Sequence, residues 1–143
     1  MTTQAVNPPG LVDSFLCNCA DCRKLTSSVT GAANFTVLSS PPHLTYTRGE
    51  DLLTQFAISS STTTGNEMVN FFCSKCGSLM FRRGEGYPGL TLMRIGTVDD
   101  ANLAEGKLKP RLEQFVENRV AWQGPAEGVR QVRGYAYGDE KDK

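Results

Sequence analysis

The chain has 143 residues, of which 15 are Lys or Arg and 15 are Asp or Glu, so its formal net charge is zero. This length fits one small domain with a modest core, which a bound metal could stabilise. Balanced charge argues against a broad basic surface, so we expect neither nucleic acid nor a membrane as a partner. No apolar run reaches the ~18 residues needed to span a bilayer, and residues 1–10 lack a secretory pattern. The sequence therefore predicts a cytoplasmic protein.

Short segments in which apolar and polar residues alternate predict a mainly β fold with little helix. The expected strands are Leu11–Cys17, Asn34–Leu38, Leu44–Thr47, Leu52–Ser59, Glu67–Phe72, Ser78–Arg82 and Leu90–Ile95. Turn-forming residues between several of these segments fit hairpins. The best helical candidate, Leu108–Val120, has Pro110 near its start and could equally be extended.

The order of these segments indicates a single domain over residues 11–133. Residues 1–10 are expected to be a flexible N-terminus, and the charged, glycine-rich residues 134–143 a flexible tail. We expect the large aromatic side chains to form the core rather than a stacking surface. These are Phe35, Phe71, Phe72, Phe81 and Trp122.

All five cysteines fall in two short clusters. Cys17, Cys19 and Cys22 lie in Cys-Asn-Cys-Ala-Asp-Cys, and Cys73 and Cys76 lie in Cys-Ser-Lys-Cys-Gly. An odd number of cysteines with a Cys-x-Cys spacing argues against a disulfide framework. A redox pair at Cys19 and Cys22 would need a strand-to-helix junction in a βαβ unit, and no strong amphipathic helix is predicted after Cys22. Zinc held by thiolates is the favoured interpretation.

Two arrangements of the metal ligands are open. In one, Cys17, Cys19 and Cys22 bind one ion and leave a fourth position for water or substrate, which is typical of a catalytic zinc. In the other, Cys19, Cys22, Cys73 and Cys76 form a closed zinc ribbon, and the protein is a binding module.

Neighbouring residues could tune both clusters. Gly77 is expected to adopt a positive φ, which lets backbone N–H groups point at the sulfurs of the second cluster. Arg23 and Lys24 follow the first cluster, and their charges should lower the pKa of its thiols and could attract an anionic ligand.

The ordered motifs carry a resemblance. Cys-x-Cys-x-x-Cys-Arg-Lys, followed roughly fifty residues later by Phe-Cys-x-x-Cys-Gly-Ser and then by Gly96-Thr97-Val98-Asp99-Asp100, resembles the glutathione-dependent formaldehyde-activating enzyme family, which includes centromere protein V. The resemblance covers about Leu11–Trp122.

This resemblance implies a β-tent fold of antiparallel sheets with zinc-binding cysteine loops. Cys17, Cys19 and Cys22 would hold a catalytic zinc, and Cys73 and Cys76 would supply half of a four-cysteine structural zinc site. The implied activity is that of a carbon–sulfur lyase acting on glutathione, or another small thiol, and its aldehyde adduct, such as S-(hydroxymethyl)glutathione. A non-catalytic, zinc-stabilised interaction module is the alternative.

Two features depart from the family pattern. The opening Gly-Ser-Cys-x-Cys-Gly strand, which supplies the other two structural ligands, is absent from this sequence. The structural zinc could therefore be missing, use other ligands or be rearranged, or the sequence could be a shortened form of a longer protein. Asn18 occupies the position where many relatives have histidine, which could alter the surroundings of the catalytic ion.

Overall fold

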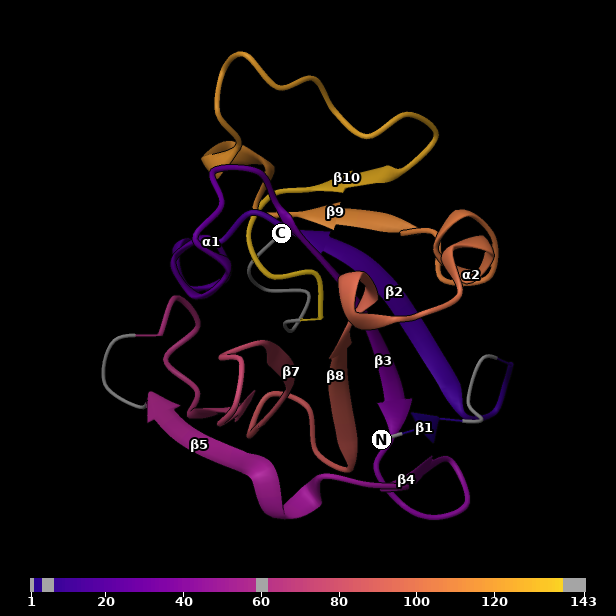
Figure 1. The fold of residues 1–143 in the computed structure, drawn as a ribbon. Coiled ribbons are helices and arrows are strands. Elements are labelled where there is room, and N and C mark those ends of the chain that lie inside the picture. The colour runs from indigo at the N-terminus through magenta and orange to yellow at the C-terminus, as the bar shows by residue number, and fades with distance from the viewer. Residues whose placement is uncertain (1, 4–6, 59–61, 138–143) are drawn as a thin grey trace.

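An eight-stranded mixed sheet organises the computed structural model, which describes residues 2–3, 7–58 and 62–137 (Figure 1). The strand order is β10-β9-β2-β3-β8-β7-β6-β5. The strands are β2 (Leu11–Cys17), β3 (Ala32–Leu38), β5 (Leu53–Ile58), β6 (Met68–Cys73), β7 (Leu79–Gly84), β8 (Leu90–Arg94), β9 (Leu112–Gln114) and β10 (Arg130–Val132). Two short strands, β1 (Thr2–Thr3) and β4 (Leu44–Thr45), pair antiparallel in a separate small sheet.

Helices are short and lie in the connections between strands. The α-helices are α1 (Ala20–Thr26) and α2 (Ala101–Glu105), and the 3₁₀ turns are η1 (Glu50–Leu52), η2 (Ile95–Thr97) and η3 (Val116–Asn118). Figure 1 shows α1 on the left and α2 on the right of the view, with β9 and β10 above β2 and with β5 at the far end of the sheet. No helix in the described part of the chain is long and apolar enough to traverse a lipid bilayer.

The predicted mainly β class is confirmed, and each strand expected from the sequence has a counterpart. The last residue of the expected strand Leu52–Ser59 lies outside the described residues. The sheet is not purely antiparallel, because β9 runs parallel to both β2 and β10. This pairing brings the C-terminal part of the chain beside the strand that carries Cys17.

The helical candidate Leu108–Val120 is not a helix. Its middle forms β9, because the N–H of Arg111 donates to the carbonyl of Ser14 at 2.9 Å and continues the pairing with β2. Phe115 then takes a left-handed conformation, with φ of 56°, and redirects the chain. The extended alternative is therefore correct for Leu112–Gln114, while Val116–Asn118 forms the 3₁₀ turn η3.

An apolar cluster lies on each face of the sheet, since alternate residues of its central strands point to opposite sides. Leu92 and Met93, adjacent on β8, belong to different apolar clusters. One cluster contains Leu11, Phe35, Val37, Leu44, Phe81, Met93, Ile95 and Leu108. The other contains Phe15, Cys17, Cys19, Cys22, Ala32, Met68, Leu92, Leu112 and Phe115. The first cysteine cluster is thus part of the protein core.

The aromatic residues expected in the core do not all lie there. Phe35 and Phe81 are fully buried, and the ring of Phe71 stacks on that of Phe81 at 4.4 Å. Trp122 is 72% exposed, so its assignment to the core is wrong. Trp122 lies in the irregular segment between η3 and β10, where no strand positions it over the sheet.

Residues near both ends of the chain take part in the fold. In the expected N-terminal arm, Thr2 and Thr3 pair with β4. In the expected tail, the hydroxyl of Tyr137 donates to Asp13 Oδ2 at 2.6 Å. Residues 138–143, for which a flexible tail was expected, lie outside the described residues, as do residues 1 and 4–6 of the N-terminal arm.

Candidate metal site

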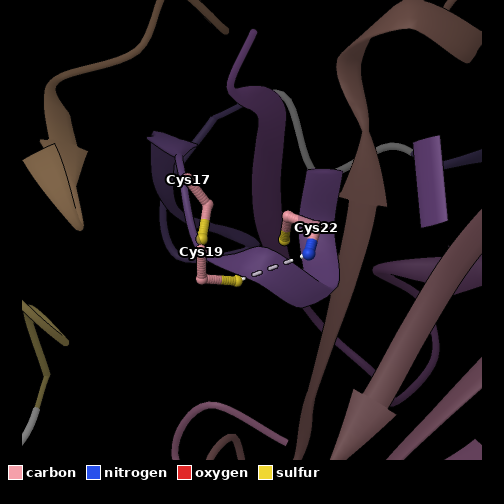
Figure 2. Close-up of side chains that lie close together, drawn as sticks. All are labelled: Cys17, Cys19 and Cys22. Atoms are coloured by element: carbon pink, nitrogen blue, oxygen red, sulfur yellow. Dashed lines mark hydrogen bonds between the residues drawn. The ribbon is translucent and has the colours of Figure 1, made fainter. Parts of the chain in front are cut away.

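Three buried cysteines converge where β2 passes into α1. The sulfur atoms of Cys17, Cys19 and Cys22 all lie within 4.8 Å of one another. Their side chains point toward a common centre at the start of α1 (Figure 2). Each residue is at most 6% exposed. A single ion could therefore contact all three sulfurs.

The backbone fixes this arrangement through the junction of strand and helix. Cys17 is the last residue of β2 and pairs with Ala32 on one side and Gln114 on the other. Cys19 is the N-cap of α1, and its sulfur accepts a hydrogen bond from the N–H of Cys22 at 3.4 Å. A cysteine thus fills the position that Ser, Thr, Asp or Asn usually takes at a helix start. The sequence predicted no strong helix after Cys22, but the structure has the short helix α1 there.

Asn18 anchors the short loop between Cys17 and Cys19. Its side-chain Nδ2 donates to Glu113 Oε1 at 2.8 Å, and its backbone N–H donates to the carbonyl of Gln114 at 3.1 Å. Asn18 is 1% exposed and Glu113 is 2% exposed. Asn18 therefore positions the cysteine loop, because its hydrogen bonds tie the loop to β9.

Glu113 is in turn held by groups from the C-terminal part of the chain. Its Oε2 accepts from the N–H of Ala126 at 3.1 Å and lies 3.1 Å from Nη1 of Arg119. Burial alone would raise the pKa of Glu113, but the N–H of Ala126, the amide of Asn18 and Arg119 together lower it. Glu113 is therefore a buried carboxylate that stabilises the loop in its ionised form.

Two buried arginines face the cysteine cluster from the sheet. Arg82 of β7 donates from Nη1 to the sulfur of Cys22 at 3.5 Å and from Nε to Asn70 Oδ1 at 2.7 Å. Arg94 of β8 donates from Nη1 to Asn34 Oδ1. Among the described residues, no hydrogen-bond partner meets Nε or Nη2 of Arg94. Both arginine residues are 5% exposed, and their buried positive charges favour negative charge at the cluster.

The pKa values of the three thiols are shifted in different directions. Hydrogen bonds with Cys17 and Cys19, together with the charges of Arg94 and Arg82, lower the pKa of Cys22. The pKa of Cys17 is raised by its hydrogen bonds with Cys19 and Cys22 and by burial. The hydrogen bond with Cys17 lowers the pKa of Cys19, but Cys22 and burial raise it to about 11. Cys22 is therefore the thiol of the cluster that loses its proton most readily.

Sequence reasoning assigned the nearby positive charge to Arg23 and Lys24. In the structure, Nη1 of Arg23 donates to the carbonyl of Asn118 at 3.4 Å, and Lys24 is exposed. The charges that act on Cys22 come from Arg94 and Arg82 instead. The sequence did not reveal that these two arginines and Glu113 surround the cysteine cluster. Alternation along β7 and β8 puts them on the cysteine face, but that face is defined only once α1 is placed.

A small cavity of about 40 Å³ adjoins the cysteines. Apolar side chains make most of its wall, namely Phe15, Met68, Tyr87, Leu92, Phe115 and Tyr135. Asn34, Arg82 and Gln114 add polar groups close to the sulfurs. The mixture of apolar walls and a few converging polar groups is the kind of lining that ligand sites have, but the space is much smaller than a usual ligand pocket.

Cys73 and Cys76 lie elsewhere, at the turn between β6 and β7. Cys73 is half-buried and Cys76 is exposed. Gly77 has a φ of 73°, as expected, and its N–H donates to the carbonyl of Cys73 at 2.8 Å. A hydrogen bond with Ser78 lowers the pKa of Cys76. Cys73 and Cys76 do not join the cluster around Cys22, so the four-cysteine ribbon is not formed in the described structure.

The fold and site together define a mainly β protein that buries a three-cysteine cluster able to hold a metal ion beside a small cavity. A model of the glutathione-dependent formaldehyde-activating enzyme family matches residues 2–118. The chain belongs to this family, as its cysteine motifs predicted. A comparison with curated proteins gave no match.

Proposed function

We propose that Cys17, Cys19 and Cys22 bind one Zn²⁺ and that the protein acts as a carbon–sulfur lyase on a small thiol, such as glutathione, and its aldehyde adduct. The observation that carries the proposal is the buried three-sulfur cluster, which opens on a cavity in a chain of this family. A tetrahedral zinc with Zn–S bonds of about 2.3 Å separates its sulfurs by about 3.8 Å. The observed limit of 4.8 Å is compatible with that spacing.

The charges around the cluster favour an anionic ligand. Three thiolates and one divalent ion carry a net charge of about −1, and Arg82 and Arg94 add two positive charges from the sheet. The bound ion would supply a positive charge that keeps a ligand thiol deprotonated or polarises a carbonyl oxygen. The two arginines add to that preference, because they are buried and lack a carboxylate partner among the described residues.

The surrounding side chains orient the Cys22 sulfur and keep water away from the cavity. Arg82 fixes the position of the Cys22 sulfur, and Asn70 in turn holds Arg82. Phe15 and Phe115 line the cavity and are at most 6% exposed, so they exclude water from the space beside the sulfurs. Electrostatic interactions are stronger in such a water-poor space.

Thiol binding by the zinc-loaded protein tests the proposal. Glutathione should shift the zinc X-ray absorption spectrum toward a four-sulfur shell, whereas S-methylglutathione, which has no thiolate to offer, should not. Arg82→Met should weaken glutathione binding about tenfold, because a charge-assisted contact at Cys22 is lost. Arg83→Met is the matched control, since Arg83 lies on the other face of β7, over the rings of Phe71 and Phe81.

A spectrum that does not change with added glutathione would contradict the proposal. It would favour the alternative, a zinc-stabilised module that interacts with a partner without catalysis. Equal loss of affinity in the Arg82→Met and Arg83→Met variants would show that the charge beside Cys22 is not what selects the ligand.

A further inference from the structure

Residues 134–137 lie beyond the span that the family model matches, residues 2–118, yet they return to the cysteine site. The N–H of Phe115 donates to the carbonyl of Gly134 at 3.1 Å. The N–H of Ala136 donates to Gln114 Oε1 at 3.1 Å. These contacts hold the segment against the end of β9, next to Cys17.

Tyr135, in this segment, forms one wall of the cavity together with Tyr87. The two rings meet edge to face, with centroids 5.8 Å apart and an interplanar angle of 82°. The Tyr135 hydroxyl donates to the carbonyl of Gly86 at 3.1 Å. Tyr137 contacts both rings edge to face, at 5.7 and 6.0 Å. The wall is therefore fixed by ring packing and by a hydrogen bond to the loop that carries Tyr87.

The space that this wall encloses is small. A water-sized sphere needs about 10–15 Å³. The cavity of about 40 Å³ therefore has room for about three non-hydrogen atoms beside the sulfurs. A larger group on the aromatic side of this space would have to displace a ring, and Phe15 and Phe115 are both buried in the core. Thr63 and Thr64, on the other side, are exposed and leave room for the rest of a thiol ligand. Tyr135 and Tyr87 are both half-buried, so truncating either would enlarge the site with less damage to the core than truncating Phe15 or Phe115. Tyr135 is the one that lies outside the matched family span.

We propose that Tyr135 is a specificity-determining residue, which with Tyr87 restricts the group beside the cysteine sulfurs to a carbon substituent of one or two carbons. This inference rests on the proposed function, because it describes the aldehyde-derived carbon of the thiol adduct. It assigns the size limit to a part of the chain outside the matched family span.

Alkylation of the folded, reduced protein tests the size limit without requiring activity. The probes are iodoacetamide and N-benzyl iodoacetamide, which share a reactive group and differ in bulk. Mass spectrometry of the peptides compares labelling at Cys17, Cys19 and Cys22 with labelling at Cys73 and Cys76 in the same molecules. The second pair is more exposed and serves as the internal reference.

The wild-type protein should discriminate against the benzyl reagent at the buried cluster by tenfold or more, relative to the reference pair. Tyr135→Ala should remove most of that discrimination, and Tyr135→Phe should keep it, because the ring remains. Trp122→Ala is the matched control from the same part of the chain, since Trp122 is 72% exposed and does not line the cavity. If Tyr135→Ala fails to fold by circular dichroism, Tyr135→Leu replaces it, because leucine keeps apolar contact with a shorter side chain.

Wild-type protein that labels equally with both reagents, or a Tyr135→Ala or Tyr135→Leu variant that keeps full discrimination, would overturn the inference. The two proposals fail separately. Loss of size discrimination in the variant, combined with no glutathione binding by the zinc-loaded protein, would leave the wall established and the proposed lyase function rejected.

Discussion

The chain contains the spacing Cys-x-x-Cys twice, and the two copies have very different surroundings. Cys19 and Cys22 lie at the start of α1, buried beneath the sheet and next to a third cysteine. Cys73 and Cys76 lie in a tight turn, with Cys76 exposed. The spacing is the same, so the difference comes from the tertiary structure. Only the first pair has its sulfurs gathered with a third ligand among the described residues.

The pKa of the second cysteine is lowered in both copies, but different neighbouring groups cause the shift. In the buried copy, neighbouring thiols donate to Cys22, and Arg94 and Arg82 add their charges. In the exposed copy, Ser78 is the main cause of the lowered pKa of Cys76. Charges separated from water act more strongly than a contact in solvent. The comparison therefore supports the proposal that the chemistry occurs at the buried copy.

The largest expected effect is on metal content. Cys22→Ser should abolish tight zinc binding, because a hydroxyl is a poor replacement for a thiolate, while Cys76→Ser should leave it intact. Protein prepared without added zinc should contain about one ion per chain. Binding of a thiolate-held zinc is coupled to folding by about 10 kcal/mol, so Cys22→Ser should also lower Tm far more than Cys76→Ser. Metal analysis and calorimetry measure these outcomes, and equal metal loss in the two variants would contradict the assignment.

The next effect concerns the carboxylate behind the buried copy. Glu113→Ala should lower the free energy of unfolding by about 3 kcal/mol, because Arg119 loses its buried partner and Asn18 loses an acceptor. Glu127→Ala, at an exposed position, should change it by less than about 0.5 kcal/mol. Urea denaturation of both variants in the presence of a chelator separates this effect from metal binding.

The effect of Glu113 should depend on pH in a defined direction. The pKa of Glu113 is lower in the folded protein than the ordinary value of 4.5, so its contribution is present above that pH. The contribution is lost as the pH falls through the lower, folded pKa. The difference between wild type and Glu113→Ala should therefore shrink upon acidification. A difference that grows below pH 4.5 would show that Glu113 is protonated in the folded state.

The sequence predicted the parts of this structure that local pattern determines. Alternation of apolar residues gave β2 with its observed limits, and cysteine spacing gave the ligands of the buried cluster. The helix α1 escaped prediction because it has only seven residues and begins at a cysteine rather than at a usual N-cap residue. Its position is set by packing against β3 rather than by helix propensity.

The surroundings of the site depend on pairing between distant segments, which local pattern does not contain. Arg82 and Arg83 are adjacent and chemically identical, yet one contacts Cys22 and the other packs on Phe81. Only the face on which α1 lies distinguishes them. Glu113 reaches Asn18 because β9 pairs parallel with β2, a non-local contact between residues 95 positions apart. Such contacts require the register of the sheet to be known.

The smallest expected effects come from replacing one glycine near each cysteine pair, namely Gly31 near the buried pair and Gly77 in the exposed turn. A Cβ at Gly31 would lie 2.6 Å from Oδ1 of Asn18, whose side chain is buried and held by Glu113. Gly31→Ala should therefore destabilise the fold by about 2 kcal/mol and weaken zinc binding, because the loop between Cys17 and Cys19 must shift. A Cβ at Gly77 would meet nothing within 4 Å. Its φ of 73° nevertheless makes Gly77→Ala cost about 1 kcal/mol, with zinc affinity unchanged. Denaturation and competition with a chromogenic chelator measure the two quantities separately, and a larger loss of zinc affinity in Gly77→Ala than in Gly31→Ala would move the principal metal site to the exposed turn.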